Sequence, residues 1–187
     1  MQLRSDEELA RGIQRGRRDD LTLLVERHHS PLLGFLYRMA GGDRSLAEDL
    51  VQETFVRILH GIHHYDYPRP FKPWLYQIAA NLARDHYKRA DTRRTDSLPE
   101  DDVSLRPADE MLPEDVFLLN SESRQVAAAI RQLPAHQREV VILRYYQEFS
   151  LAEIADALDI PIGTVKSRLS IGLNRLRTAW LEQEQEP

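Results

Sequence analysis

The sequence has no cysteine, few glycines and no long apolar run, and each absence removes a class of function. None of its 187 residues is Cys and only 8 are Gly. Without cysteine there is no disulfide scaffold, thiolate metal site or cysteine nucleophile, which fits a reducing compartment. No apolar stretch approaches the ~18 residues of a membrane span, and the N-terminal segment MQLRSDEELARG has no apolar core after its charges. We therefore expect a soluble, cytoplasmic protein without membrane insertion or a signal peptide.

Patterns of catalysis and metal binding are also missing. The chain has no glycine-rich phosphate loop, no nucleophile elbow and no HExxH motif. His60, His63 and His64 are spaced to share a helix face and could hold a metal, but no cysteine or further ligand pattern supports them. We therefore expect no catalytic residue, no metal and no cofactor, and leave the role of these histidines open.

Charge is unevenly distributed along the chain, whose formal net charge is −5. Residues 91–120 have 3 basic and 9 acidic side chains, or −6, whereas residues 1–90 give +2 and residues 121–187 give −1. The acidic segment also contains three prolines and no sustained apolar period, so we expect a flexible acidic linker, with helix resuming near Val116. Such a linker reaches up to about 100 Å when extended, so its flanks can lie well apart.

Both flanks show helical periodicity, which predicts an all-α fold of two small helical domains, residues 1–90 and 121–187. Capping boxes are expected at Ser5/Glu8 and Ser150/Glu153. Other helices are expected to start and stop at capping residues, glycines or prolines: starts at Asp19 or Asp20 and at Asp43 or Ser45, and stops at Gly41-Gly42, Pro134 and Pro161. The segment YDYPRPFKP (65–73) is expected to be a loop, followed by a helix to about Arg89.

Residues 150–177, SLAEIADALDIPIGTVKSRLSIGLNRLR, have the pattern of a helix-turn-helix. Small Ala155 stands where the two helices would cross, and Asp159 occupies a turn position where it tolerates a left-handed conformation better than most residues. The start of the second helix, which would enter the major groove, carries polar and basic side chains: Thr164, Lys166, Ser167, Arg168 and Ser170. Lys166 and Arg168 are two residues apart and should point in different directions. The alternative is an ordinary helical hairpin with a solvated basic face.

A second polar stripe follows the YDYPRPFKP loop, on the helix that begins near Trp74. Its members, at spacings of four, three and four, are Gln77, Asn81, Arg84 and Lys88. Aromatic and basic residues stand close by, namely Tyr65, Tyr67, Phe71, Lys72 and Tyr87. Bases of single-stranded nucleic acid stack on such rings while cations hold the phosphates. The alternative is a solvated helix face with aromatic residues in the core.

A third pattern is an acidic patch formed by Glu48, Asp49, Gln52 and Glu53, with Phe55 facing inward. Paired carboxylates can serve acid–base chemistry. No set of polar partners for a pocket accompanies them, so a solvated or protein-binding face is favoured.

Together these segments resemble a bacterial RNA polymerase sigma factor of the extracytoplasmic-function (ECF) group, within the sigma-70 family. The resemblance covers nearly the whole chain. It rests on DLVQETFVRIL (49–59), PFKPWLYQIAANLARDHYKR (70–89) and LPAHQREVVILRYYQEFSLAEIADALDIPIGTVKSRLSIGLNRLR (133–177), which occur in the family's order and separation.

The resemblance implies a role for each segment. The N-terminal domain, sigma region 2, would bind the β′ clamp helices of core RNA polymerase through Asp49, Gln52, Glu53 and Phe55. It would recognise and melt the minus-10 promoter element through Tyr65, Tyr67, Phe71, Lys72, Gln77, Asn81, Arg84 and Lys88. The C-terminal domain, sigma region 4, would contact the polymerase β flap and dock on the minus-35 element through Thr164, Lys166, Ser167, Arg168 and Ser170. The acidic linker would run near the polymerase cleft, and an anti-sigma protein would cover these same surfaces.

Two other functions are weighed against this one. A stand-alone helix-turn-helix regulator would bind operators without polymerase, and an enzyme with a carboxylate or histidine site is supported by no constellation of residues. A protein that binds promoters only within polymerase need not be basic overall, because two weak tethered sites become specific when both engage.

Overall fold

The computed structural model describes residues 4–96 and 121–183, which form helices joined by short loops. The N-terminal half contains α1 (Asp6–Gln14), α2 (Arg18–Met39), α3 (Arg44–Gly61), the short 3-10 helix η1 (Ile62–His64) and α4 (Phe71–Asp96). The C-terminal half contains α5 (Ser121–Gln132), α6 (Ala135–Tyr145), α7 (Leu151–Leu158) and α8 (Ile162–Gln183). No strand occurs in these two ranges, which confirms the all-α prediction.

Side-chain caps begin several helices as predicted. Ser5 and Ser150 each accept a hydrogen bond from the backbone N–H three residues later, and Glu8 and Glu153 accept from the backbone N–H of those serines. Asp43 caps α3 in the same way. These bonds satisfy N–H groups that have no partner inside the helix, and each cap stabilises its helix by about 1 kcal/mol.

Two boundaries differ from the prediction. α2 begins after Arg17 rather than at Asp19 or Asp20, because Asp20 is buried and holds Arg4 and Arg17 instead of capping the helix. α4 continues to Asp96, past the expected end at Arg89, so the first residues of the expected linker are helical. The rest of that linker, including the helix expected near Val116, lies outside the described residues.

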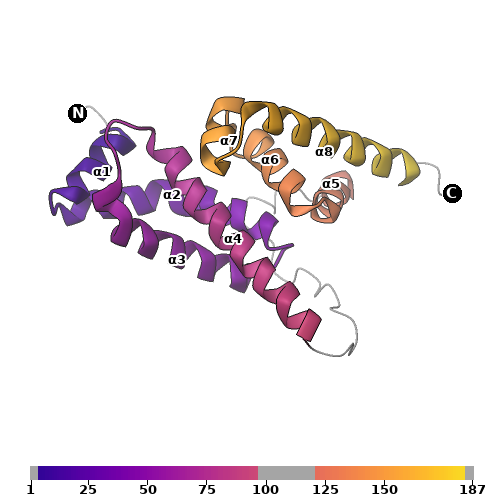
Figure 1. Ribbon diagram of the computed structural model, residues 1–187, viewed down its shortest axis with the longest axis horizontal. Helices are drawn as coiled ribbons and strands as arrows, with labels where there is room; N and C mark the ends of the chain where they lie inside the picture. Colours follow the sequence, from indigo (N-terminus) through magenta and orange to yellow (C-terminus); the bar gives the residue numbers. More distant parts are fainter. Residues whose placement is uncertain (1–3, 97–120, 184–187) are drawn as a thin grey trace.

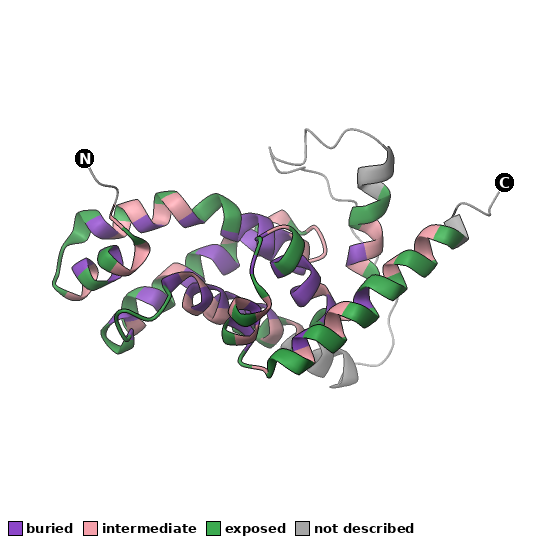
Figure 2. Ribbon diagram, turned by 90° about the horizontal axis from the view of Figure 1, so that it is seen from above, coloured by how far each residue is buried: buried purple, intermediate pink, exposed green. Residues whose placement is uncertain are grey.

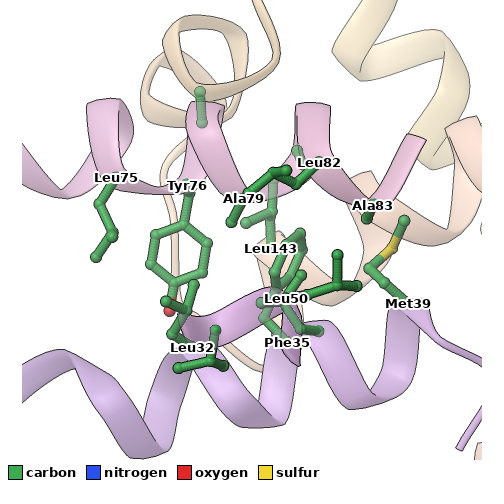
Figure 3. Close-up of a cluster of buried hydrophobic side chains, with 14 of the residues drawn as sticks. Leu32, Phe35, Met39, Leu50, Leu75, Tyr76, Ala79, Leu82, Ala83 and Leu143 are labelled. Atoms are coloured by element: carbon green, nitrogen blue, oxygen red, sulfur yellow. The ribbon is translucent and has the colours of Figure 1, made fainter. Parts of the chain in front are cut away.

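One hydrophobic core runs through both halves of the described chain. Phe35 of α2 packs edge-on against Tyr76 of α4 at 5.2 Å between ring centroids, and Phe149, just before α7, packs against the same tyrosine at 5.0 Å. All three rings are buried. Figure 3 shows Leu143 of α6 among the side chains that α2 and α4 contribute.

This shared core follows from how the helices pack. α7 lies against α4, and α2 contacts both α5 and α6, so the two halves lie side by side (Figure 1). Within the C-terminal half, α6 and α7 both support α8. The helix with the expected minus-10 stripe is therefore placed directly beside the helix-turn-helix.

Asp159 ends α7 in the left-handed conformation, with φ 53° and ψ 51°. A glycine has no Cβ to strain this conformation, so Asp159→Gly is expected to raise the free energy of unfolding by about 0.5–1 kcal/mol. Urea unfolding measures this change. Asp156→Gly, at an exposed site inside the same helix, is the control and should instead destabilise by about 1 kcal/mol. Destabilisation by both changes would contradict the prediction.

Candidate nucleic-acid interface

The two basic residues near the start of α8 point in different directions, as expected. Lys166, Ser167 and Ser170 are exposed. Arg168 turns toward α6, where its Nη1 lies 3.2 Å from Oε1 of Glu139. Thr164 is half-buried, and its carbonyl oxygen accepts a hydrogen bond from the Ser167 hydroxyl at 3.0 Å. Figure 2 shows that the long last helix keeps an exposed face along most of its length.

Glu139 of α6 lies between the two halves, and its side chain is only 2% exposed. Arg84 of α4 brings its Nε within 3.2 Å of Oε2, as an ion pair without hydrogen-bond alignment. Arg168 of α8 donates to the other carboxylate oxygen. Burial raises the pKa of Glu139, while the charges of the two arginines act to lower it. One buried carboxylate thus holds a cation from each of the two stripes that were expected to contact DNA.

The rest of the α4 stripe differs in exposure. Asn81 and Lys88 are exposed, and Gln77 is half-buried. In this arrangement Asn81 and Lys88 are accessible to a ligand, whereas Arg84 is paired with Glu139.

Lys72, at the start of α4, also contacts the C-terminal half. Its Nζ donates to the backbone oxygen of Gln147 at 3.0 Å and lies 4.5 Å from the ring centroid of Phe149. The side chain of Gln147 accepts a hydrogen bond from the Tyr76 hydroxyl at 2.5 Å and donates to the Pro31 oxygen at 3.1 Å. Gln147 is buried, and its side-chain amide joins α2, α4 and the loop before α7.

The aromatic residues expected to stack on bases fall into two groups. Tyr65 and Phe71 are buried and pack edge-on against each other at 5.8 Å between centroids. Burial raises the pKa of Tyr65 to about 12. These two rings match the core alternative and are not on the surface in this arrangement. Tyr87 is half-buried and donates to the Met39 oxygen, whereas Tyr67 is 39% exposed.

The expected polymerase-binding residues share the outer face of α3, with one exception. Asp49, Gln52 and Glu53 are exposed, and Glu53 pairs with Arg57 at 2.8 Å. Phe55 is partly buried against the core and therefore supports the helix from beneath. The acidic face is exposed, which both the solvated and the protein-binding interpretation require.

Two apolar residues on this face were missed. Val56 is 44% exposed and Leu59 is 39% exposed. They follow Gln52 and Glu53 at helical spacing, so they lie on the same face of α3. The sequence contains a signal for them. Val51 and Ile58 are spaced to share the buried face of the helix, and Val56 and Leu59 do not lie on that face.

The described residues offer neither a metal site nor a membrane-spanning helix. Within residues 4–96 and 121–183, no group of three or more His, Cys, Asp or Glu side chains could hold a metal ion. None of the helices in these ranges is both long and apolar enough to cross a membrane.

Two family models match the chain. The model described as "Sigma-70 region 2" matches residues 24–93, and the model described as "Sigma-70, region 4" matches residues 123–176. The ECF RNA polymerase sigma factor SigW of Bacillus subtilis is 35% identical over 173 residues, covering 88% of this chain and 91% of the relative.

Two solved structures are similar to this chain. CnrH in complex with the cytosolic domain of CnrY has a TM-score of 0.69 at 25% identity, covering 96% of this chain and 99% of the other. The sigma factor RpoE of Bartonella quintana, in complex with the anti-sigma factor NepR, has a TM-score of 0.68 at 24% identity, covering 90% of this chain and 99% of the other.

The first family match includes α3 and α4, and the second includes the helix-turn-helix of α7 and α8. The surfaces described above thus lie within the segments that define sigma regions 2 and 4. The protein directs promoter-specific initiation of transcription through RNA polymerase, and the chain belongs to the ECF group of the sigma-70 family.

Proposed function

We propose that this sigma factor acts in the cytoplasm, without catalysis of its own, by binding core polymerase through α3 and promoter DNA through α4 and α8. The observation that carries the proposal is the exposed face of α8. Lys166, Ser167 and Ser170 lie there at the start of the second helix of a capped helix-turn-helix. Side chains at this position reach base edges and phosphates when such a helix enters the major groove.

The polymerase-binding surface is the outer face of α3. Val56 and Leu59 are its apolar part, and Asp49, Gln52 and Glu53 are exposed polar residues beside them, toward the N-terminal end of the helix. Apolar residues bordered by polar ones are the usual composition of a protein interface. We assign this face to the β′ clamp helices and place the β flap against the C-terminal half.

In this proposal α4 and the loop before it bind the minus-10 element. Tyr67, Asn81 and Lys88 have exposed surface in the closed form and are the first contacts. Lys72 and Arg84 join them once their partners in the C-terminal half are released. Polar amides, cations and an exposed ring together suit a single strand.

The two halves must separate before both promoter elements are bound. Elements about 25 base pairs apart lie roughly 85 Å apart along B-form DNA. Arg84 and Arg168 meet on one carboxylate, so the described arrangement cannot place both at their elements. We take this arrangement as the closed form of the free chain, which opens in the polymerase complex.

An anti-sigma protein is the inhibitory partner in this proposal. The structure of RpoE with NepR, which this chain resembles in fold, is that of a sigma factor held by an anti-sigma factor. A protein that binds both halves of the closed form would keep the promoter surfaces covered.

The competing function is a stand-alone operator-binding regulator. Gel-shift and run-off transcription assays, with and without core polymerase, separate the two functions. We expect promoter DNA to shift, and a specific transcript to form, only when core polymerase is present. A specific shift by the free chain at physiological salt would support the regulator instead.

Lys166→Ala is expected to lower transcription from a cognate promoter by about tenfold, because in the proposed complex its exposed cation would face the groove. Arg175→Ala is the matched control, since Arg175 is exposed on the opposite side of α8 and should change transcription less than twofold. Run-off transcription by the holoenzyme measures both. Equal losses in the two variants would show that only the total charge of the helix matters.

A further inference from the structure

We infer that α1 positions the promoter loop, defined as residues 65–70, and that Gln14 is the positioning residue for promoter melting. The inference rests on the proposed role of this loop at the minus-10 element. α1 lies outside residues 24–93, the segment matched by the region 2 model, so that match assigns it no role.

Gln14, the last residue of α1, binds the start of the loop. Its Nε2 donates to the backbone oxygen of Ile62 at 2.8 Å and to that of Tyr65 at 2.7 Å. A side-chain amide has two N–H donors, and both are used here on carbonyl groups of one turn. The turn that leads from η1 into the promoter loop is therefore fixed by a side chain about fifty residues earlier in the chain.

Two further residues of α1 contact the middle of the loop and the first residue after it. The Arg11 guanidinium lies over the Tyr67 ring, 4.6 Å from its centroid. Glu7 accepts a hydrogen bond from the backbone N–H of Phe71 at 3.1 Å, at the first turn of α4. A carboxylate at this place accepts from an N–H that has no partner within the helix, and the positive end of the helix dipole stabilises its negative charge. α1 thus sets where α4 begins.

α1 itself is seated firmly on α2. Asp6 lies 2.7 Å from Nε2 of His28 and 2.8 Å from Nη1 of Arg27. Burial acts to raise the pKa of Asp6, but the hydrogen bonds from these partners outweigh it, so the pKa is lowered and the carboxylate is ionised. At Gly12, an added Cβ would come within 1.7 Å of the Asp20 carboxylate, which shows how closely the two helices approach.

These contacts place Tyr67 and the first turn of α4 by way of α1. Losing the donors of Gln14 frees the turn at the start of the loop. The exposed face of α3 consists of other residues, so binding to polymerase should survive this loss. The step that suffers is capture of the melted strand, for which the loop must be in place before the strand arrives.

Gln14→Glu tests the inference, because it keeps the shape of the side chain but replaces both N–H donors by oxygen. We expect the holoenzyme to form open complexes about tenfold more slowly, with polymerase affinity within twofold of the unchanged protein. Permanganate reactivity of promoter thymines follows melting over time. Hydrogen exchange of the free chain should show weaker protection of the turn at Tyr65. Gln14→Lys, which keeps N–H donors on a long side chain, should recover part of the rate.

Gln132→Glu is the matched control, since it makes the same change at an exposed site in α5. Arg11→Gln is a second variant that changes an exposed side chain, and it should slow the same step by two- to threefold. Melting at the unchanged rate in Gln14→Glu would overturn the inference. So would an equal loss of polymerase affinity, which indicates general destabilisation. If the unchanged holoenzyme melts no promoter, it is the proposed function that fails.

Discussion

Replacing Val56 and Leu59 together by aspartate should reduce the affinity for core RNA polymerase by about 100-fold or more. Both side chains are exposed in the free protein and form the apolar part of the α3 face. Burying an apolar side chain of this size at an interface contributes roughly 1.5–3 kcal/mol. The aspartates lose this contribution and also place two carboxylates where water is excluded. Because the sites are exposed, the fold should be preserved.

A binding titration with core polymerase measures this loss, and circular dichroism checks that the helices remain. Val126→Asp, at an exposed apolar position in α5, is the control and should leave the affinity unchanged. Lysine at Asp49 and Glu53 should have a smaller effect, since these residues lie beside the apolar part. If the double aspartate variant still binds polymerase with the original affinity, α3 does not provide the polymerase surface.

Glu139→Gln is expected to open the free protein. The change preserves size but leaves Arg84 and Arg168 without their shared counter-ion. Removing one member of a fully buried ion pair costs about 3–5 kcal/mol, and the cost here should be smaller because the side chains of Arg84 and Arg168 remain 33% and 27% exposed. Part of this cost is relieved when α4 leaves the C-terminal half and Arg84 becomes solvated. We therefore expect both lower stability and a larger separation of the halves.

Energy transfer between two dyes measures this separation. The chain has no cysteine, so a pair of introduced cysteines at exposed Arg57 and Arg177 can be labelled without competing sites. Arg84→Gln should open the halves while sparing the contact of Glu139 with α8. Glu48→Gln is the control, because it removes a carboxylate paired with Arg44 on the surface of α3, and it should change neither the stability nor the dye distance appreciably. An unchanged dye distance in Glu139→Gln would show that this carboxylate does not hold the halves together.

Local features of the fold could be predicted from the sequence because they depend on neighbouring residues. The capping boxes at Ser5 and Ser150 and the left-handed turn at Asp159 each arise within a few positions of the chain. The opposite directions of Lys166 and Arg168 follow from the helical repeat alone. For these features, sequence spacing determines the geometry.

Other features depend on contacts between distant segments, and the sequence does not reveal them. Asp20 has the position of a helix cap in the sequence, but the fold brings Arg4, from the segment before α1, to its carboxylate. The aromatic loop gave no sign of which rings would be covered, because Phe71 is buried by packing that includes His28 of α2. Glu139 lies in a helix with no acidic pattern, and only the fold brings Arg84 and Arg168 to it.

The interface around Glu139 and Gln147 also affects how the protein searches a genome. The closed form holds Lys72, Arg84 and Arg168 on partners within the protein, so the apparent affinity of the free chain for DNA that needs these cations falls in proportion to the fraction that is open. Each 1.4 kcal/mol of interface stability lowers that affinity about tenfold. Non-specific sites outnumber promoters by many orders of magnitude, so this reduction keeps unbound copies off the chromosome and available to polymerase. Because the free chain binds DNA weakly, it reaches promoters mainly as part of the polymerase complex, and initiation is more selective.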